Sequence, residues 1–194
     1  MDGLTIEATS HIQVIILMII LALTAWTDLN FHRIPNVLSL GGIALAIVLH
    51  SWMAGGTGLL TGIGGAAVGM SIFLPLYLLH GMSAGDVKLI GTVGAFLGPH
   101  NAMLAAGFSL VAGGILALVI LLTRGGLGDL VKRYWSTLKC FVYTHKFVHP
   151  PPSIGEVAAM KFPYASAIGT GTLVMLWWTN ELQGLTDFLS TLIR

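Results

Sequence analysis

The chain has 194 residues, of which 55% are hydrophobic and only 9% are charged, and its mean hydropathy is +0.87. A soluble domain carries charge on about a quarter of its residues, so this composition excludes a water-exposed globular domain and predicts a membrane protein. The single cysteine, Cys140, excludes an internal disulfide and a multi-cysteine metal site. The first ten residues contain acidic residues but no Lys or Arg, so we expect the first apolar run to be retained rather than removed as a signal peptide.

Apolar stretches separated by glycine and proline predict an all-α membrane helix bundle of about six transmembrane helices. In chain order they cover about Ile12–Trp26, Val37–Trp52, Leu59–Leu79, Val87–Leu97, Met103–Thr123 and Val157–Trp178. The fourth stretch is short for a complete crossing. The C-terminal segment, Glu181–Arg194, spaces its apolar residues at helical intervals, which predicts an amphipathic helix at the membrane surface.

The basic residues predict the orientation of this bundle. With six crossings both termini lie on one side, and eight of the nine Lys and Arg residues lie on the other: Arg33, Lys88, Arg124, Lys132, Arg133, Lys139, Lys146 and Lys161. Because cytoplasmic loops are enriched in Lys and Arg, we expect these loops to be cytoplasmic and the termini to be outside. Residues 124–156 form the longest cytoplasmic loop in this arrangement. We expect one membrane-embedded domain, residues 1–194.

Two acidic residues occupy positions where a charge is costly. Asp28 follows the first apolar stretch and Asp86 opens the fourth, so the predicted orientation places both at the cytoplasmic face. A carboxylate at the edge of the hydrocarbon is expensive unless it is paired or serves a function. Two converging carboxylates cannot both ionise cheaply and share one proton, so one can accept a proton from water while the other donates to a scissile carbonyl.

Helix ends indicate which carboxyl group holds the shared proton. Asp86 lies at a predicted helix N-terminus, which stabilises negative charge, and Asp28 lies near a C-terminus, which does not. We therefore expect the proton mainly on Asp28. Spacing alone leaves open the alternative that both aspartates only cap helices or balance Arg33 and Lys88.

The sequences around both aspartates resemble the type IV prepilin peptidases. In that family an Asp precedes an Ile-Pro-Asn turn by six residues, as Asp28 precedes Ile34-Pro35-Asn36 here. A second family Asp closes a Gly-x-Gly-Asp motif followed by Val-Lys-Leu, as Asp86 closes Ser83-Ala84-Gly85-Asp86 before Val87-Lys88-Leu89. A weaker match begins at Phe162-Pro163-Tyr164, so the resemblance spans about Trp26 to Ile168.

The resemblance implies an intramembrane aspartic endopeptidase with Asp28 and Asp86 as its catalytic pair. Its substrates would be prepilins or pseudopilins, cut at the cytoplasmic face of the bacterial inner (plasma) membrane. Larger members of the family carry an N-terminal domain with paired Cys-x-x-Cys motifs and an added N-methyltransferase activity. This sequence has no such cysteines, so it resembles the short, peptidase-only branch that serves Flp or tight-adherence pili.

Ser83 stands where the family pattern has the first motif glycine. Glycine there would serve either a positive φ angle or a close contact with another helix. Serine adopts positive φ poorly but is small, so we expect a close helix contact at Ser83 and retained cleavage in Ser83→Ala. The stronger backbone requirement is then expected at Gly85.

Other motif residues have expected supporting roles. Pro35 fixes the turn into the second helix, Asn36 caps that helix, and Gly85 permits close backbone approach beside Asp86. Lys88 extends to the membrane interface, or alternatively holds an Asp or a substrate carbonyl. The histidines show no ligand spacing, so we expect no metal and no cofactor. Prepilin-type substrates and membrane lipid are the expected partners, and nucleic acid is not.

Three further functions were weighed against a leader peptidase. A proton-coupled transporter would use the aspartates as relay groups, but no acidic residue lies at mid-membrane to complete a path. A non-enzymatic pilus-assembly scaffold predicts that Asp-to-Asn changes are harmless. A protease of the presenilin or signal-peptide-peptidase type shares Gly-x-Gly-Asp but places its first Asp after a Tyr, where this chain has Thr27.

Overall fold

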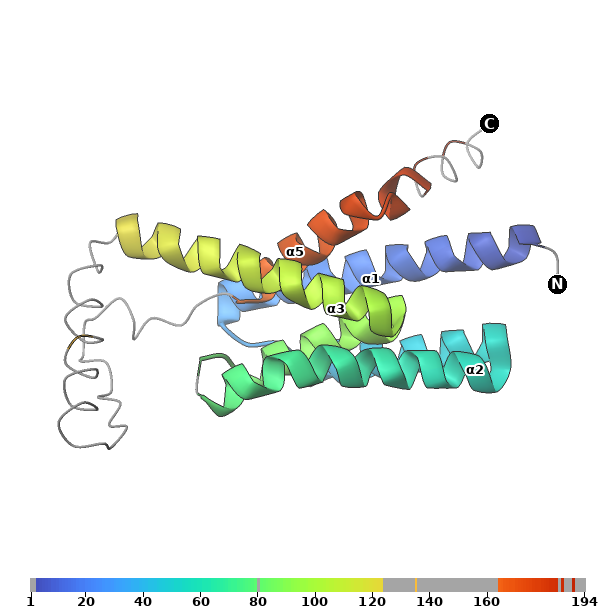
Figure 1. The fold of residues 1–194 in the computed structure, drawn as a ribbon, viewed down its shortest axis with the longest axis horizontal. Coiled ribbons are helices and arrows are strands. Elements are labelled where there is room, and N and C mark those ends of the chain that lie inside the picture. The colour runs from blue at the N-terminus through green and yellow to red at the C-terminus, as the bar shows by residue number, and fades with distance from the viewer. Residues whose placement is uncertain are drawn as a thin grey trace. The chain divides into compact units, whose positions relative to one another are not determined.

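The computed structural model describes residues 3–79, 81–123, 135, 164–184, 186 and 190 (Figure 1). Its helices are α1 (Gly3–Phe31), α2 (Asn36–Leu78), α3 (Ala84–Thr123) and α5 (Tyr164–Trp178). Within these described ranges the regular secondary structure is entirely helical, which confirms the predicted all-α class. The predicted cytoplasmic loop, residues 124–156, lies outside the described residues apart from Trp135.

The chain divides into two compact units. The first consists of Met1–Gly113 and Pro163–Arg194, and the second of Gly114–Phe162. Both aspartates lie in the first unit. The expectation of one domain over residues 1–194 stays a prediction.

Three of the described helices are apolar and long enough to cross a membrane: α1 over His11–Phe31, α2 and α3. The number of crossings, expected to be about six, stays a prediction. In the expected C-terminal amphipathic segment, residues 181–184, 186 and 190 are helical. Whether that segment lies at a membrane surface is untested.

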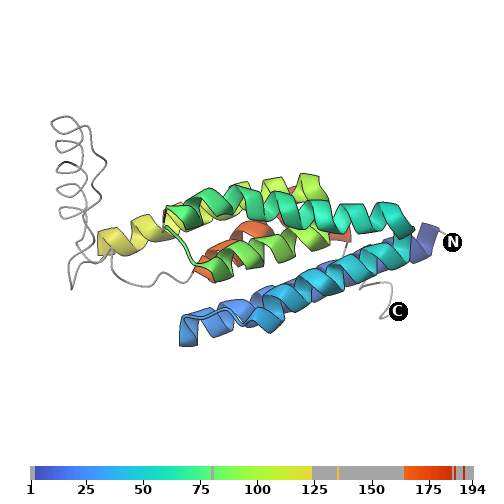
Figure 2. The same cartoon turned by 90° about the horizontal axis from the view of Figure 1, so that it is seen from below.

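Helix α2 reverses direction within its length. Ala54 and Gly55 have non-helical backbone angles, with φ at Gly55 of 58°, a conformation that glycine adopts without a steric penalty. A methyl group on Gly58 would collide with the carbonyl oxygen of His50, and one on Gly62 would lie 3.2 Å from Ile47. The two halves of α2 are therefore packed antiparallel, as Figure 2 shows. They correspond to the second and third predicted apolar stretches.

Helix α3 has a similar break at Gly98, where φ is 77°. Pro99 follows, and it removes a backbone donor that an uninterrupted helix would use. A methyl group on Gly94, before the break, would lie 3.1 Å from Cβ of Ala102, after it. The halves on either side of Gly98 therefore pack antiparallel, and the predicted break between the fourth and fifth apolar stretches is confirmed.

Small residues set the spacing between helices. A methyl group on Gly65 or on Gly94 would collide with the carbonyl oxygen of the other, and one on Gly171 would collide with the backbone of Ser109. Close backbone approach of this kind is the usual packing mode of membrane helices. The larger apolar side chains that are fully buried include Leu17, Phe73, Leu89, Ile90 and Ile168.

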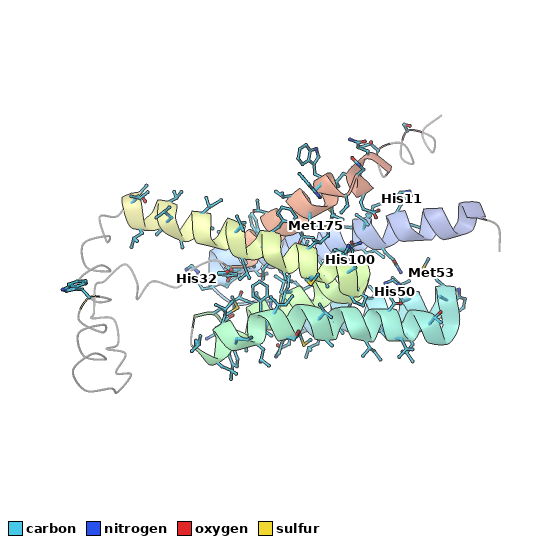
Figure 3. The ribbon with its side chains drawn as sticks, in the orientation of Figure 1. His11, His32, His50, Met53, His100 and Met175 are labelled. Atoms are coloured by element: carbon cyan, nitrogen blue, oxygen red, sulfur yellow. The ribbon has the colours of Figure 1, made fainter. Side chains whose placement is uncertain are left out.

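Histidines mark opposite ends of the first unit. His32 lies where α1 ends, whereas His11, His50 and His100 lie toward the other end (Figure 3). Nε2 of His50 lies 3.0 Å from the carbonyl oxygen of Phe96, just before the break in α3. His50 therefore has a hydrogen-bond partner within the first unit.

Candidate active site

Asp28 lies in the last turn of α1, and the residues after it hold this turn in place. The backbone N–H of His32 donates to the carbonyl oxygen of Asp28 at 2.9 Å. His32 has φ of 50°, a left-handed conformation that often ends helices. Pro35, with φ of −62° and ψ of 131°, then occupies the N-cap position before α2. The turn at Pro35 agrees with the role expected for it, and Asp28 is fixed at the end of the helix.

The carboxyl group of Asp28 is held by α5. Only 7% of Asp28 is exposed, and its Oδ2 accepts a hydrogen bond from the backbone N–H of Ala165 at 3.1 Å, across 137 positions of sequence. Ala165 is the second residue of α5, and the first N–H groups of a helix have no partner within it. Asp28 therefore caps α5.

This contact removes the basis for placing the shared proton on Asp28. The expectation considered only the C-terminus of α1, which disfavours negative charge. The N-terminus of α5 lies at the same carboxyl group and favours negative charge there. The two helix ends oppose one another at Asp28, so helix position does not assign the proton.

Asp86 lies in the first turn of α3 and is more deeply buried, with 4% exposed. Its Oδ2 accepts hydrogen bonds from the backbone N–H and from Oγ of Ser83, both at 2.8 Å. The backbone N–H of Asp86 in turn lies 3.3 Å from Oγ of Ser83. This reciprocal arrangement is a capping box, in which a Ser and an acidic residue three positions later satisfy each other's backbone donors.

The structure brings the two aspartates into one site. Their charges are close enough to interact, although they come from the end of α1 and the beginning of α3. Both side chains are buried, and the hydrogen bonds that hold them come from helix starts. Among the described residues, no group of three or more His, Cys, Asp or Glu is placed to hold a metal ion.

The sequence model of the type IV leader peptidase family matches residues 15–118, more than half of the chain. The chain belongs to the type IV leader peptidase family. The matched region contains both aspartates and ends before α5. Neither a curated protein nor a solved structure matches the chain significantly. Family membership, together with three helices suited to crossing a membrane, makes the chain a membrane peptidase.

Tyr164 is a further residue of this candidate site. It begins α5, next to the Ala165 N–H that binds Asp28, and its phenol interacts electrostatically with Asp86. Its ring packs edge-on against Phe73, with centroids 6.1 Å apart and an interplanar angle of 89°. A methyl group on Gly113 would lie 2.6 Å from the phenol oxygen. The sequence contained a signal, the Pro-Tyr of the weak third motif, but no role followed from it.

Asn36 and Lys88 connect the starts of α2 and α3. Nζ of Lys88 donates to Oδ1 of Asn36 at 3.0 Å, so Lys88 contacts another motif residue rather than either aspartate. The expectation that Asn36 caps α2 is wrong. Pro35 holds the cap position, and its carbonyl oxygen accepts the first helical N–H groups, from Leu38 at 3.1 Å and Ser39 at 3.3 Å.

The contacts of Ser83 and Gly85 differ from those expected from the sequence. Ser83 does not have a positive φ, as expected, but it is exposed, which argues against the expected close helix contact there. The close contact lies at Gly85, where a methyl group would be 3.2 Å from Cβ of Ile34. The neighbouring atoms there belong to side chains, so the expected close backbone approach beside Asp86 stays a prediction. The role of the Ser83 hydroxyl is the hydrogen bond to Asp86, which sequence reasoning missed.

Proposed function

We propose that this family member is an intramembrane aspartic endopeptidase that removes the leader from prepilin-like substrates, with Asp28 and Asp86 as its catalytic pair. The observation that carries the proposal is the presence of two buried aspartates, from α1 and α3, close enough for their charges to interact, in a chain of the leader peptidase family. Each aspartate has one oxygen anchored by backbone N–H donation. In this proposal the second oxygen of each aspartate exchanges a proton with water or with the scissile carbonyl group.

The pair acts by general acid and base catalysis. The ionised carboxylate accepts a proton from water as the water oxygen attacks the scissile carbonyl carbon, and the protonated partner donates to the carbonyl oxygen. The resulting tetrahedral intermediate is a gem-diol. As its C–N bond breaks, the first aspartate gives its proton to the leaving amine and the second aspartate takes a proton back from one of the two hydroxyl groups, which leaves the carboxylic acid product and the starting protonation state of the pair. Two carboxyl groups with one shared proton supply both roles at neutral pH. The pair itself needs no metal ion for these steps.

The proposed substrates are single-span prepilins or pseudopilins with a short basic leader. Cleavage would take place at the cytoplasmic face of the bacterial inner membrane, with the termini of the chain outside. Support comes from the positive-inside distribution of Lys and Arg and from the position of both aspartates at helix ends. The resemblance to the short branch of the family makes Flp-type pilins the first substrates to test.

Asparagine variants test the catalytic pair. Asp28→Asn and Asp86→Asn each keep an oxygen that accepts the anchoring N–H but cannot exchange a proton, so each is expected to abolish leader removal while the protein stays in the membrane. Glu181→Gln is a matched control, because it also neutralises one acidic residue of the first unit but lies after α5. Each variant is co-expressed with a prepilin and the size of the pilin is followed on a gel. Complete processing by either aspartate variant would refute the aspartic mechanism.

A further inference from the structure

Ser83 makes three hydrogen-bond contacts with Asp86 through its N–H and hydroxyl, in addition to the backbone hydrogen bond that the Asp86 N–H donates to the Ser83 carbonyl oxygen at 3.2 Å. Its backbone N–H and its hydroxyl both donate to Oδ2, each at 2.8 Å, and its Oγ lies 3.3 Å from the backbone N–H of Asp86 as an acceptor. A hydroxyl group can donate one hydrogen bond and accept others at the same time. The three contacts are therefore compatible with one another and close a ring around the start of α3.

The buried state of Asp86 makes these donors important. With 4% of the residue exposed, water cannot solvate the carboxylate fully, and an unsatisfied buried charge is strongly unfavourable. The titratable groups around Asp86 on the other packed helices are Asp28, which is also acidic, and Tyr164. Lys88, on the same helix, donates to Asn36. Within the described part of the chain, the hydrogen bonds to this carboxylate come from the N–H and the hydroxyl of Ser83.

Both donors bind the same oxygen, and this fixes the direction of the carboxyl group. Oδ2 is turned back toward the start of α3, so Oδ1 is left to act on substrate. A glycine at position 83, as in the family pattern, would keep the backbone N–H donor but would lack the hydroxyl. The hydroxyl of this chain therefore adds a second donor to the carboxylate and a second acceptor, beside the Ser83 carbonyl oxygen, for the backbone N–H of Asp86.

We propose that Ser83 is a positioning residue for Asp86, whose hydroxyl holds Oδ2 so that Oδ1 is the oxygen that exchanges a proton with the attacking water. The inference rests on the proposed function, because it assigns the reactive oxygen of one catalytic carboxylate. Ser83 contacts neither water nor substrate in this role. It acts through the orientation and charge of Asp86.

Kinetics with a purified prepilin in detergent test the role of the hydroxyl. Ser83→Ala removes Oγ and keeps the N–H, so kcat is expected to fall about tenfold, the equivalent of one hydrogen bond to a charged group, with KM unchanged. Ser83→Gly is expected to behave like Ser83→Ala, and Ser83→Thr, which keeps the hydroxyl, is expected to restore kcat. The control is Ser71→Ala, because Ser71 is exposed and its Oγ donates to a backbone carbonyl of its own helix at 2.8 Å.

Each rate is divided by the folded fraction, measured by size-exclusion chromatography in the same detergent. A kcat of Ser83→Ala equal to that of Ser71→Ala overturns the inference. A loss of kcat that is fully explained by a smaller folded fraction also overturns it. Full activity in Ser83→Gly with a defect in Ser83→Ala would assign the role to backbone freedom instead of the hydroxyl, and would overturn it as well.

A second measurement does not depend on cleavage. Dicyclohexylcarbodiimide modifies protonated carboxyl groups in apolar surroundings, and the modified residues are located by mass spectrometry. Without the hydroxyl donor the carboxylate of Asp86 is less stable relative to its protonated form, which is the form that the reagent modifies. Ser83→Ala is therefore expected to speed modification of Asp86 about tenfold and to leave Asp28 modified at the parental rate. Equal rates at Asp86 in both proteins overturn the inference. A parent protein that cleaves no prepilin would refute the proposed function, while this labelling result would still stand on its own.

Discussion

The variant Gly85→Ala is expected to affect the stability of the protein and the cleavage rate to different extents. Gly85 lies in the first turn of α3, directly before Asp86. In Gly85→Ala the new methyl group would lie 3.2 Å from Cβ of Ile34 and 3.3 Å from Oγ of Ser83. Contacts this short require a neighbour to move by a few tenths of an ångström. The Ile34 atom belongs to a branch point close to the backbone, so the start of α3 must move instead.

Two energies of opposite sign decide the stability of this variant. Replacement of glycine by alanine in a helix stabilises by about 0.5–1 kcal/mol, whereas overpacking costs about 1–3 kcal/mol. The free energy of unfolding should therefore fall by between about 0 and 2.5 kcal/mol. Catalysis is more sensitive, because a displacement of about 1 Å can cost a hundredfold in rate. A shift of a few tenths of an ångström at Asp86 is expected to lower the cleavage rate about tenfold.

The matched control is Gly107→Ala in the same helix, where a methyl group would have no neighbour within 4 Å. Helix propensities were calibrated in water. This variant therefore measures, in the membrane protein itself, the change in the free energy of unfolding that comes from replacing a helical glycine by alanine. Cleavage of one prepilin and thermal unfolding in one detergent are measured for the parent and both variants. If Gly85→Ala cleaves as fast as Gly107→Ala, the reasoning about Ile34 is refuted.

The remaining predictions concern packing, topology, cofactors and the turn after α1. Gly171→Ala should lower the free energy of unfolding by about 1–3 kcal/mol through overpacking, while Gly169→Ala, which has open space around it, should not; equal melting curves would contradict this. A reporter active only outside the cytoplasm should work when fused after Arg194 and fail when fused near Lys139, and the opposite pattern would reverse the proposed orientation. The purified protein should cleave in the presence of a chelator and transfer no methyl group; loss of cleavage that zinc restores would disprove a metal-free site. His32→Gly should keep cleavage and raise the melting temperature, because glycine adopts the observed φ of 50° without strain; a lower melting temperature would show that the side chain stabilises the turn.

Local signals in the sequence predicted the helical breaks well. Gly55 and Gly98 both have positive φ, and in each case the neighbouring residues, a second glycine or a proline, already marked a stop. The apolar composition likewise predicted helices because a membrane leaves few alternatives for satisfying the backbone. Features determined by a few adjacent residues were therefore accessible without a structure.

Two errors came from small shifts in helix boundaries. The fourth apolar stretch was placed from Val87, which left Ser83 in a loop, whereas α3 begins at Ala84. With that boundary Ser83 and Asp86 have the spacing of a capping box, a signal present in the sequence but not used. Similarly, α2 starts at Asn36, so Pro35 is the cap residue, and the Asn36 side chain accepts a hydrogen bond from Lys88 instead.

The contact between Asp28 and Ala165 could not be predicted from any local pattern. The two residues are separated by 137 positions, and the hydrogen bond joins a side chain to a backbone N–H, so the identity of the donor residue carries no information. The weak third motif indicated that the start of α5 mattered. Only the packing of α5 against α1 shows why.

The capping of α5 by Asp28 has a consequence for how the protein is made. Ribosomes synthesise α1 well before α5, so during insertion Asp28 exists for a time without the Ala165 N–H that it binds in the finished fold. The carboxyl group reaches its final hydrogen bonding only when the last of the described long helices docks. Assembly of the active site is thus coupled to completion of the chain, and a nascent peptidase lacks one of the contacts that orient its catalytic pair.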